Sequence, residues 1–186
     1  IDIGPSSLGL ISLLKEALPE KDRHFVAYYR MRMTKDYCIN PFDTQLGCRY
    51  PTPLERSFLT NFLTLLATPL GSDSPYDGVS DMCALVIDEM YKEMDDKQKP
   101  NKYTHQINQE VDEKIIALKM EVDSYTSWWE VTDFLFSKEK VHAALLAQRY
   151  AVPVIADAVA VARTTNVEDL FGKVVAPTQE PLIQAF

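Results

Sequence analysis

The chain has 186 residues, of which 46% are hydrophobic and 25% charged, and its formal net charge at pH 7 is -8. This length suits one domain, or one domain plus a fragment, and the apolar content predicts a folded chain. The excess of 27 acidic over 19 basic residues argues against a surface that follows phosphates, so no direct nucleic-acid binding is expected. The apolar runs are much shorter than the ~20 residues of a transmembrane segment, and none is predicted.

The first part of the chain, residues 1–53, is predicted to be a partial α/β segment. Residues 1–3 are typical of the end of a buried strand, and a helix is expected from about 6 to 18. Alternating side chains over 28–33 predict a strand, and 37–40 a second one, close enough in sequence to pair as a hairpin. Because the chain begins within a predicted strand and without Met, it is expected to be a piece of a longer protein.

The remainder, residues 54–186, is predicted to be an all-helical subdomain. Thr52 as N-cap, Pro53 at the first helical position and Glu55 two positions further on form a capping box. The side chains expected on the buried face of this helix are Leu54, Phe58, Leu59, Phe62, Leu63 and Leu66. Two further helices are predicted at about 79–94 and 104–121. A second capping box, formed by Ser127 and Glu130, predicts the start of another helix. The last two helices are expected from Ser137 to about Tyr150 and in an alanine- and valine-rich segment with Pro153 in its first turn.

One short sequence imitates a nucleotide-binding motif. Residues 85–89, Leu-Val-Ile-Asp-Glu, match the apolar run and Asp-Glu of a Walker B strand, whose acids hold magnesium. The apolar side chains of 79–94 instead recur at helical intervals over several turns. We therefore predict a helix, with Asp88 and Glu89 on or near its solvated face.

The sequence contains no recognisable catalytic constellation. It has no G-x-x-x-x-G-K-[ST] phosphate loop, so no cofactor is expected to bind this chain by itself. The three histidines are scattered, and the three cysteines lack zinc-site spacing and are predicted to be free thiols in a reducing compartment. Glu110, Asp112 and Glu113 are interpreted as a solvated helix face. No catalytic or metal-binding residue is therefore assigned.

The loop that leads from the α/β segment into the first capped helix is the main candidate site. It is rich in proline, glycine and charge, and such loops carry function on a rigid scaffold. Arginines supplied across an interface stabilise the charge of phosphoryl transfer. Four side chains are therefore candidates for contact with a nucleotide or a neighbouring subunit: Asp43, Gln45, Arg49 and Arg56. The alternative is that Asp43 caps a turn and both arginines pair with local carboxylates.

Two adjacent tryptophans, Trp128 and Trp129, are the second candidate. Neighbouring positions on a helix point in different directions, so one of the two rings is a candidate anchor for a partner protein. The alternative is that each ring packs into a different side of the core.

The order of the motifs resembles one protein family. Ile-Asp-Ile-Gly-Pro-Ser-Ser opens the chain, Asn-Pro-Phe-Asp-Thr-Gln-Leu-Gly begins at Asn40, and Pro-x-Pro-Leu-Glu-Arg begins at Pro51. This order resembles the large conjugation and type IV secretion ATPases, most closely the DotO (IcmB) and TraU branch. The resemblance is strongest over residues 1–68 and weaker through Val-Glu-Asp-Leu-Phe at 167–171.

The resemblance implies a place within a larger ATPase domain. The chain would supply RecA-like strands and an inserted helical subdomain, with Walker A before it and Walker B after it. The parent protein would be cytoplasmic and peripheral to the bacterial inner membrane. It would form a homo-hexamer, use Mg-ATP for protein transport or conjugation, and contact a second secretion ATPase and inner-membrane components. The chain alone is expected not to hydrolyse ATP.

Three functions remain open at this point. The first is a segment that supports the nucleotide pocket and relays its state through the helices. The second is a helical docking module that binds a partner secretion ATPase or substrate adaptor without nucleotide chemistry. The third, an independent helical enzyme or regulator, needs a self-contained pocket that the sequence does not indicate.

Overall fold

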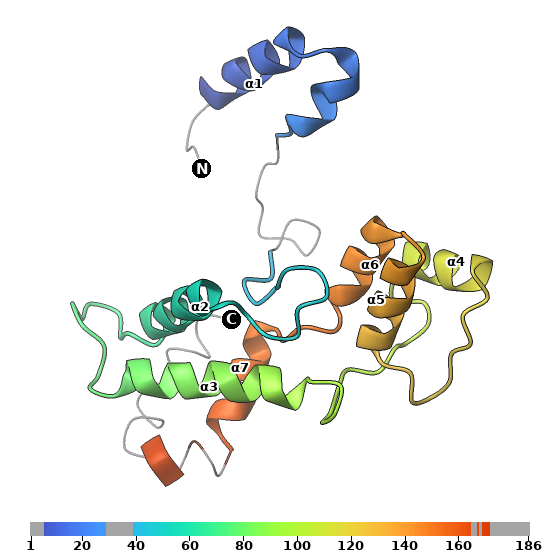
Figure 1. Ribbon diagram of the computed structural model, residues 1–186. Helices are drawn as coiled ribbons and strands as arrows, with labels where there is room; N and C mark the ends of the chain where they lie inside the picture. The colour runs from blue at the N-terminus through green and yellow to red at the C-terminus, as the bar shows by residue number, and fades with distance from the viewer. Residues whose placement is uncertain (1–5, 29–38, 165–166, 168, 172–186) are drawn as a thin grey trace. The chain divides into compact units, whose positions relative to one another are not determined.

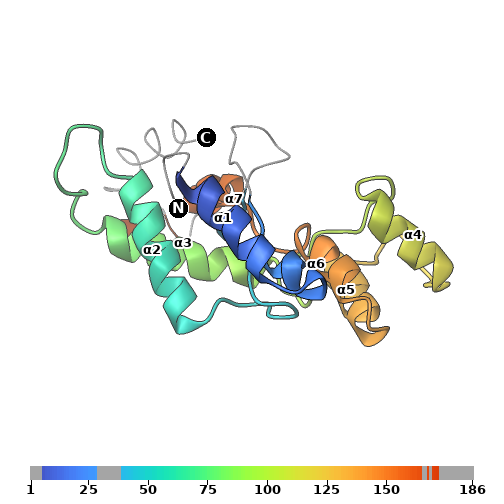
Figure 2. The ribbon, with the colours of Figure 1, turned by 90° about the horizontal axis from the view of Figure 1, so that it is seen from above.

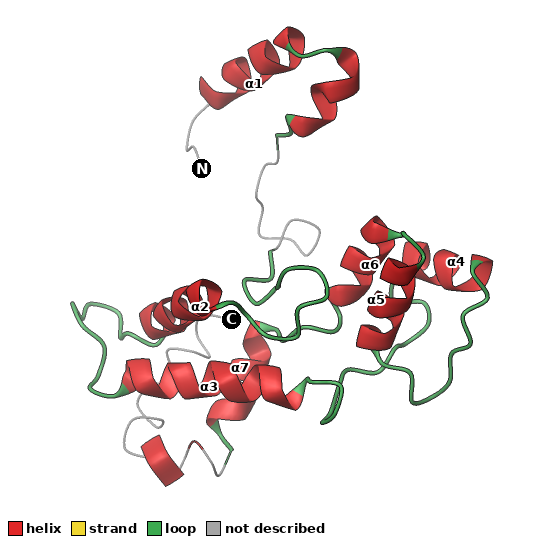
Figure 3. Ribbon diagram, in the orientation of Figure 1, coloured by secondary structure: helices red, strands yellow, loops and turns green. Residues whose placement is uncertain are grey.

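The computed structural model describes residues 6–28, 39–164, 167 and 169–171. The chain divides into two compact units, with the boundary between Ile39 and Asn40. The sequence suggested a boundary at residue 53, but the loop that begins at Asn40 makes its contacts with the helices that follow it. The described residues are mainly helical, as predicted for most of the chain, and contain no strand (Figures 1 and 3).

The predicted RecA-like strands at the N-terminus are not supported. Residues 1–3, 29–33 and 37–38 of these predicted strands lie outside the described residues. The described parts of these segments, at Tyr28, Ile39 and Asn40, are irregular. A short alternating run becomes a stable strand only with partner strands and a packed face, and the described part of the chain supplies no sheet.

The first unit contains helix α1 (Ser6–Ala17) and the 3₁₀ helix η1 (Glu20–Phe25). Helix α1 confirms the helix predicted at about 6–18. It ends just before Pro19, which is the N-cap residue of η1. Proline has no N–H to continue an α-helix, so the chain turns here.

In the part of the second unit that the structure describes, the named helices α2 to α7 form two groups (Figures 1 and 2). In the first group, α2 and α7 both pack on α3, and in the second, α5 packs on α6 and α4 packs on both. Each group has its own hydrophobic cluster. We call them the α2–α3–α7 group and the α4–α5–α6 group. Their helices are α2 (Pro53–Leu66), α3 (Val79–Glu93), α7 (Ile155–Ala162), α4 (Gln109–Ala117), α5 (Trp128–Ser137) and α6 (Val141–Gln148).

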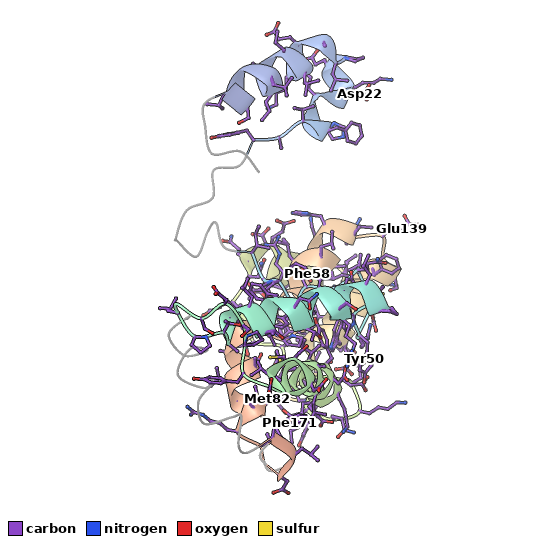
Figure 4. All side chains as sticks on the ribbon, turned by 90° about the vertical axis from the view of Figure 1, so that its left-hand side faces the viewer. Asp22, Tyr50, Phe58, Met82, Glu139 and Phe171 are labelled. Atoms are coloured by element: carbon purple, nitrogen blue, oxygen red, sulfur yellow. The ribbon has the colours of Figure 1, made fainter. Side chains whose placement is uncertain are left out.

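Helix α2 begins with the predicted capping box. The Thr52 hydroxyl accepts a hydrogen bond from the Glu55 N–H at 3.3 Å, and the Glu55 carboxylate accepts one from the Thr52 N–H at 2.7 Å. The predicted buried face is right for Leu59 and Leu63 but wrong for Leu54 and Phe58, which are 81% and 59% exposed. Helix α2 packs on α3 along one stripe, and Phe58 lies about 100° around the helix from Leu59. Figure 4 shows Phe58 on α2.

Removing the α2 cap should lower stability measurably. In Thr52→Ala, the Glu55 N–H loses its side-chain acceptor, and we expect the free energy of unfolding to fall by about 1 kcal/mol. Urea unfolding followed by circular dichroism measures this change. Ser57→Ala on the same helix is the control, because the Ser57 hydroxyl only bonds back to the Pro53 carbonyl at 2.9 Å. That control should be neutral or slightly stabilising, and equal losses in both variants would contradict the capping role.

Helix α3 confirms the helical interpretation of the Walker B look-alike. Its buried residues, spaced at helical intervals, are Val79, Met82, Cys83, Val86, Ile87, Met90 and Tyr91. Asp88 is exposed and pairs with Arg56, while Glu89 pairs with Lys92. Neither acid lies at the end of a strand, so these residues do not form a Walker B site.

Three helix boundaries differ from the prediction because of local backbone geometry. Helix α4 is shorter than the predicted 104–121, since Gln106 and Lys119 have left-handed φ angles of 70° and 55°. Ser137 ends α5 instead of capping α6, because Glu139, with φ of 59°, turns the chain between the two helices. Pro153 lies before α7, which begins at Ile155. The capping box at the start of α5 is confirmed.

None of the helices in the described residues combines the length and apolar character needed to cross a membrane. Cys48 and Cys83 are free thiols, as predicted, and burial raises the pKa of Cys83 to about 11. Cys38 lies outside the described residues.

Candidate functional site

The loop of residues 40–52, which we call the motif loop, contacts both helix groups. Phe42 is fully buried in the cluster of the α2–α3–α7 group. Four residues later, Leu46 packs against the cluster of the α4–α5–α6 group. The loop is therefore attached by apolar contacts to two separate cores, which its polar sequence did not suggest.

Hydrogen bonds fix the beginning of the motif loop. The Asn40 side-chain amide donates to the Pro153 carbonyl at 2.8 Å and accepts from the Phe42 N–H at 3.1 Å. The Tyr91 hydroxyl, on α3, donates to the Phe42 carbonyl at 2.7 Å. Burial raises the pKa of Tyr91 above its ordinary value, so the hydroxyl stays protonated and remains a donor.

Gln148 at the end of α6 fixes the middle of the motif loop. Its side chain is almost fully buried, with 1% of the residue exposed. Its amide nitrogen donates to the Thr44 carbonyl at 2.8 Å, and its amide oxygen accepts from the Gly47 N–H at 2.7 Å. Gln148 is not among the residues that the sequence predicted for the site. The available signal was its spacing of four residues from Ala144, which places a polar side chain on the buried face of an alanine-rich helix.

Arg49, one of the candidate site residues, is held by two carboxylates and an aromatic ring. Its Nη1 and Nη2 donate to the two oxygens of Asp133 on α5 at 3.0 and 2.5 Å, and its Nε donates to Asp96 at 3.0 Å. The guanidinium lies 4.4 Å from the centroid of the Trp129 ring. The pKa of Arg49 is raised, mainly by its hydrogen bond to Asp133.

Arg56 is also engaged by a carboxylate. Its Nε and Nη2 donate to the two oxygens of Asp88 on α3, both at 2.6 Å. This hydrogen bonding raises the pKa of Arg56. A phosphate would have to compete with bidentate carboxylate pairs for either arginine. The arrangement corresponds to the alternative in which both arginines pair with local acids.

The other two candidates of the motif loop are exposed. The Asp43 carboxylate accepts a hydrogen bond from the Thr44 N–H at 3.1 Å, as expected for a residue that caps a turn. The Gln45 carbonyl accepts from the Cys48 N–H at 2.8 Å, which closes the following turn. Asp43 and Gln45 lie at the surface of the same loop as Arg49, while Arg56 lies on α2.

The adjacent tryptophans both lie in the core, each 2% exposed. The Trp128 ring packs edge-on against Tyr103 and tilted against Tyr150, with centroid distances of 4.9 and 4.6 Å. The Trp129 indole N–H donates to the Met94 carbonyl at 3.2 Å. The structure therefore shows the two-sided core contact, and neither ring presents an open surface to a partner.

A buried carboxylate at the start of α4 corrects another interpretation. Asp112 was interpreted as part of a solvated face, but it is only 6% exposed. It accepts hydrogen bonds from the Tyr103 hydroxyl at 2.5 Å and the Gln106 N–H at 2.8 Å, and His105 Nδ1 lies 3.3 Å away. Burial and the bond to Asp112 raise the pKa of Tyr103. These bonds hold the bend before α4 and give Asp112 a structural role.

Comparisons of the chain with protein-family models, curated proteins and solved structures find no match. In the described part of the chain, no group of three or more His, Cys, Asp or Glu side chains is arranged to hold a metal ion. What the motif loop can do with its present contacts is connect two helix groups mechanically.

Proposed function

We propose that this chain is an internal segment of a cytoplasmic, hexameric ATPase that powers type IV secretion or conjugative transfer. Its role is to support the nucleotide pocket from one side and to relay the state of that pocket through the helices. Mg-ATP is the cofactor of the parent protein, and a second secretion ATPase and inner-membrane components are its partners. The motif order of residues 1–68 is the basis for the family.

The attachment of the motif loop to both helix groups carries the mechanical part of the proposal. The Asn-Pro-Phe-Asp-Thr-Gln-Leu-Gly motif of the resemblance begins at Asn40, and the Tyr91 and Gln148 side chains donate hydrogen bonds to it from the two groups. A displacement of this loop therefore acts on α3 and α6 at once. Packed elements pass such a displacement on because they resist deformation.

A second candidate function is a docking module without nucleotide chemistry. It is favoured by the outer face of α2, where Leu54, Phe58 and Leu65 are exposed by 81%, 59% and 71%. Apolar side chains gathered on one face are typical of surfaces that bind other proteins.

Titration of Mg-ATP into the purified chain, followed by calorimetry and phosphate release, tests the first function. We expect neither saturable heat nor turnover, because the chain has no phosphate loop. Saturable binding or turnover would contradict the fragment interpretation.

The reading frame around this chain provides the second test: a G-x-x-x-x-G-K-[ST] sequence upstream and an Asp-Glu strand downstream are expected. A reading frame that lacks either of these sequences would exclude the proposed ATPase and leave the docking module.

A further inference from the structure

The two helix groups of the second unit have separate cores. The main packing contacts between helices run within each group, from α3 to α2 and α7, and from α6 to α5 and α4. The buried residues likewise separate into two clusters. Between the groups the chain runs through the segments 94–108 and 149–154, and the motif loop packs against both groups. The angle between the groups therefore depends on contacts of these connecting segments.

Arg49 contacts the motif loop, the turn after α3 and helix α5. It bonds to the Gly47 carbonyl in its own loop, to Asp96 in the turn after α3, and to Asp133 on α5. The Arg49 guanidinium lies over the Trp129 ring, and the indole N–H of Trp129 donates to the Met94 carbonyl at the C-terminal end of α3. One guanidinium thus joins the end of the α2–α3–α7 group to a helix of the α4–α5–α6 group.

The Arg49 contacts differ from the buried contacts of Tyr91 and Gln148 because solvent reaches them. The side chains of Arg49, Asp96 and Asp133 are 19%, 42% and 55% exposed. Ion pairs of this kind are screened by salt and can be exchanged for a competing anion. They can therefore open while both helix groups stay folded.

We infer that Arg49 is a reversible clasp that holds the two helix groups at a fixed angle. When its bonds to Asp96 and Asp133 are intact, the second unit behaves as one body. When they are broken, the groups reorient about the connecting segments within the range that the buried contacts of the motif loop with Tyr91 and Gln148 allow. This inference goes beyond the proposed function, since it concerns contacts within the chain and holds with or without ATP chemistry in a parent protein.

Residual dipolar couplings of backbone amides in a neutral, steric alignment medium test the clasp. In the wild-type chain, the couplings of α2, α3 and α7 and those of α4, α5 and α6 should fit one alignment tensor. In Arg49→Gln, we expect this common tensor to be lost, with separate tensors for the two groups. Arg56→Gln is the matched control, because it removes a bidentate Arg–Asp pair that lies within one group. It should retain the common tensor.

Two results would overturn the inference. One is a common tensor in Arg49→Gln with the same orientation of the groups as in the wild type. The other is loss of the common tensor in Arg56→Gln to the same extent. Should Arg49→Gln fail to fold, the wild-type chain at increasing salt concentration replaces it. There the couplings of the two groups should progressively depart from a common tensor, and couplings that remain on one tensor at high salt would contradict the clasp.

Discussion

Truncation of Trp129 to alanine is expected to lower the free energy of unfolding by about 3–5 kcal/mol, the largest effect of any single change that we predict. The ring is 2% exposed and belongs to the cluster of the α4–α5–α6 group. Its removal leaves a cavity, takes the hydrogen bond from the Met94 carbonyl, and removes the surface on which the Arg49 guanidinium lies. Urea unfolding monitored by circular dichroism measures the loss.

Phe136→Ala is the matched control for this prediction. Phe136 lies on the same helix, α5, but is 56% exposed, so its truncation should cost far less than that of Trp129. Trp129→Phe should fall between the two, because it keeps an aromatic ring and loses the indole N–H, and it serves if the alanine variant does not fold. Similar small losses for the two alanine variants would show that Trp129 is not in the core and would restore it as a partner contact.

Replacement of Gln148 by leucine is expected to cost about 3 kcal/mol, although leucine is apolar and similar in size. The Thr44 carbonyl and the Gly47 N–H each lose a buried hydrogen bond to the Gln148 side chain. Each polar group left unpaired in the interior costs about 1–3 kcal/mol. The free energy of unfolding should fall accordingly in urea titrations. Gln109→Leu is the control, since Gln109 only bonds to Glu113 on the exposed side of α4, and it should change stability little.

A second variant, Gln148→Glu, separates hydrogen bonding from packing. It keeps the shape but turns a donor into an acceptor that faces the carbonyls of Thr44 and Gln45. Burial and these carbonyls raise the folded-state pKa of the introduced carboxyl above its unfolded value. Its deficit relative to wild type is therefore largest above that pKa and shrinks as the pH falls and the carboxyl takes a proton. A deficit of equal size at about pH 7 and about pH 5 would contradict this account of the Gln148 contacts.

The candidate site was only partly predictable. Arginines in a polar loop have strong partners wherever carboxylates lie in reach, but sequence does not say which carboxylates those are. Asp133 is 84 residues from Arg49 in the chain, and Gln148 is 104 residues from Thr44. Such pairs form only after two distant segments have packed. The role of the motif loop as a connection between two cores was therefore out of reach of any local pattern.

By itself, the sequence determined the elements whose causes are local. The capping boxes at Thr52 and Ser127 start their helices as predicted, because cap and partner lie within one turn. The apolar spacing of α3 excluded a strand, since four turns of helical periodicity cannot fit one face of a sheet. Tertiary structure decided which apolar side chains are covered. It leaves Leu54 and Phe58 in solvent and buries both Trp128 and Trp129, because burial depends on which elements pack against a helix and from how many sides.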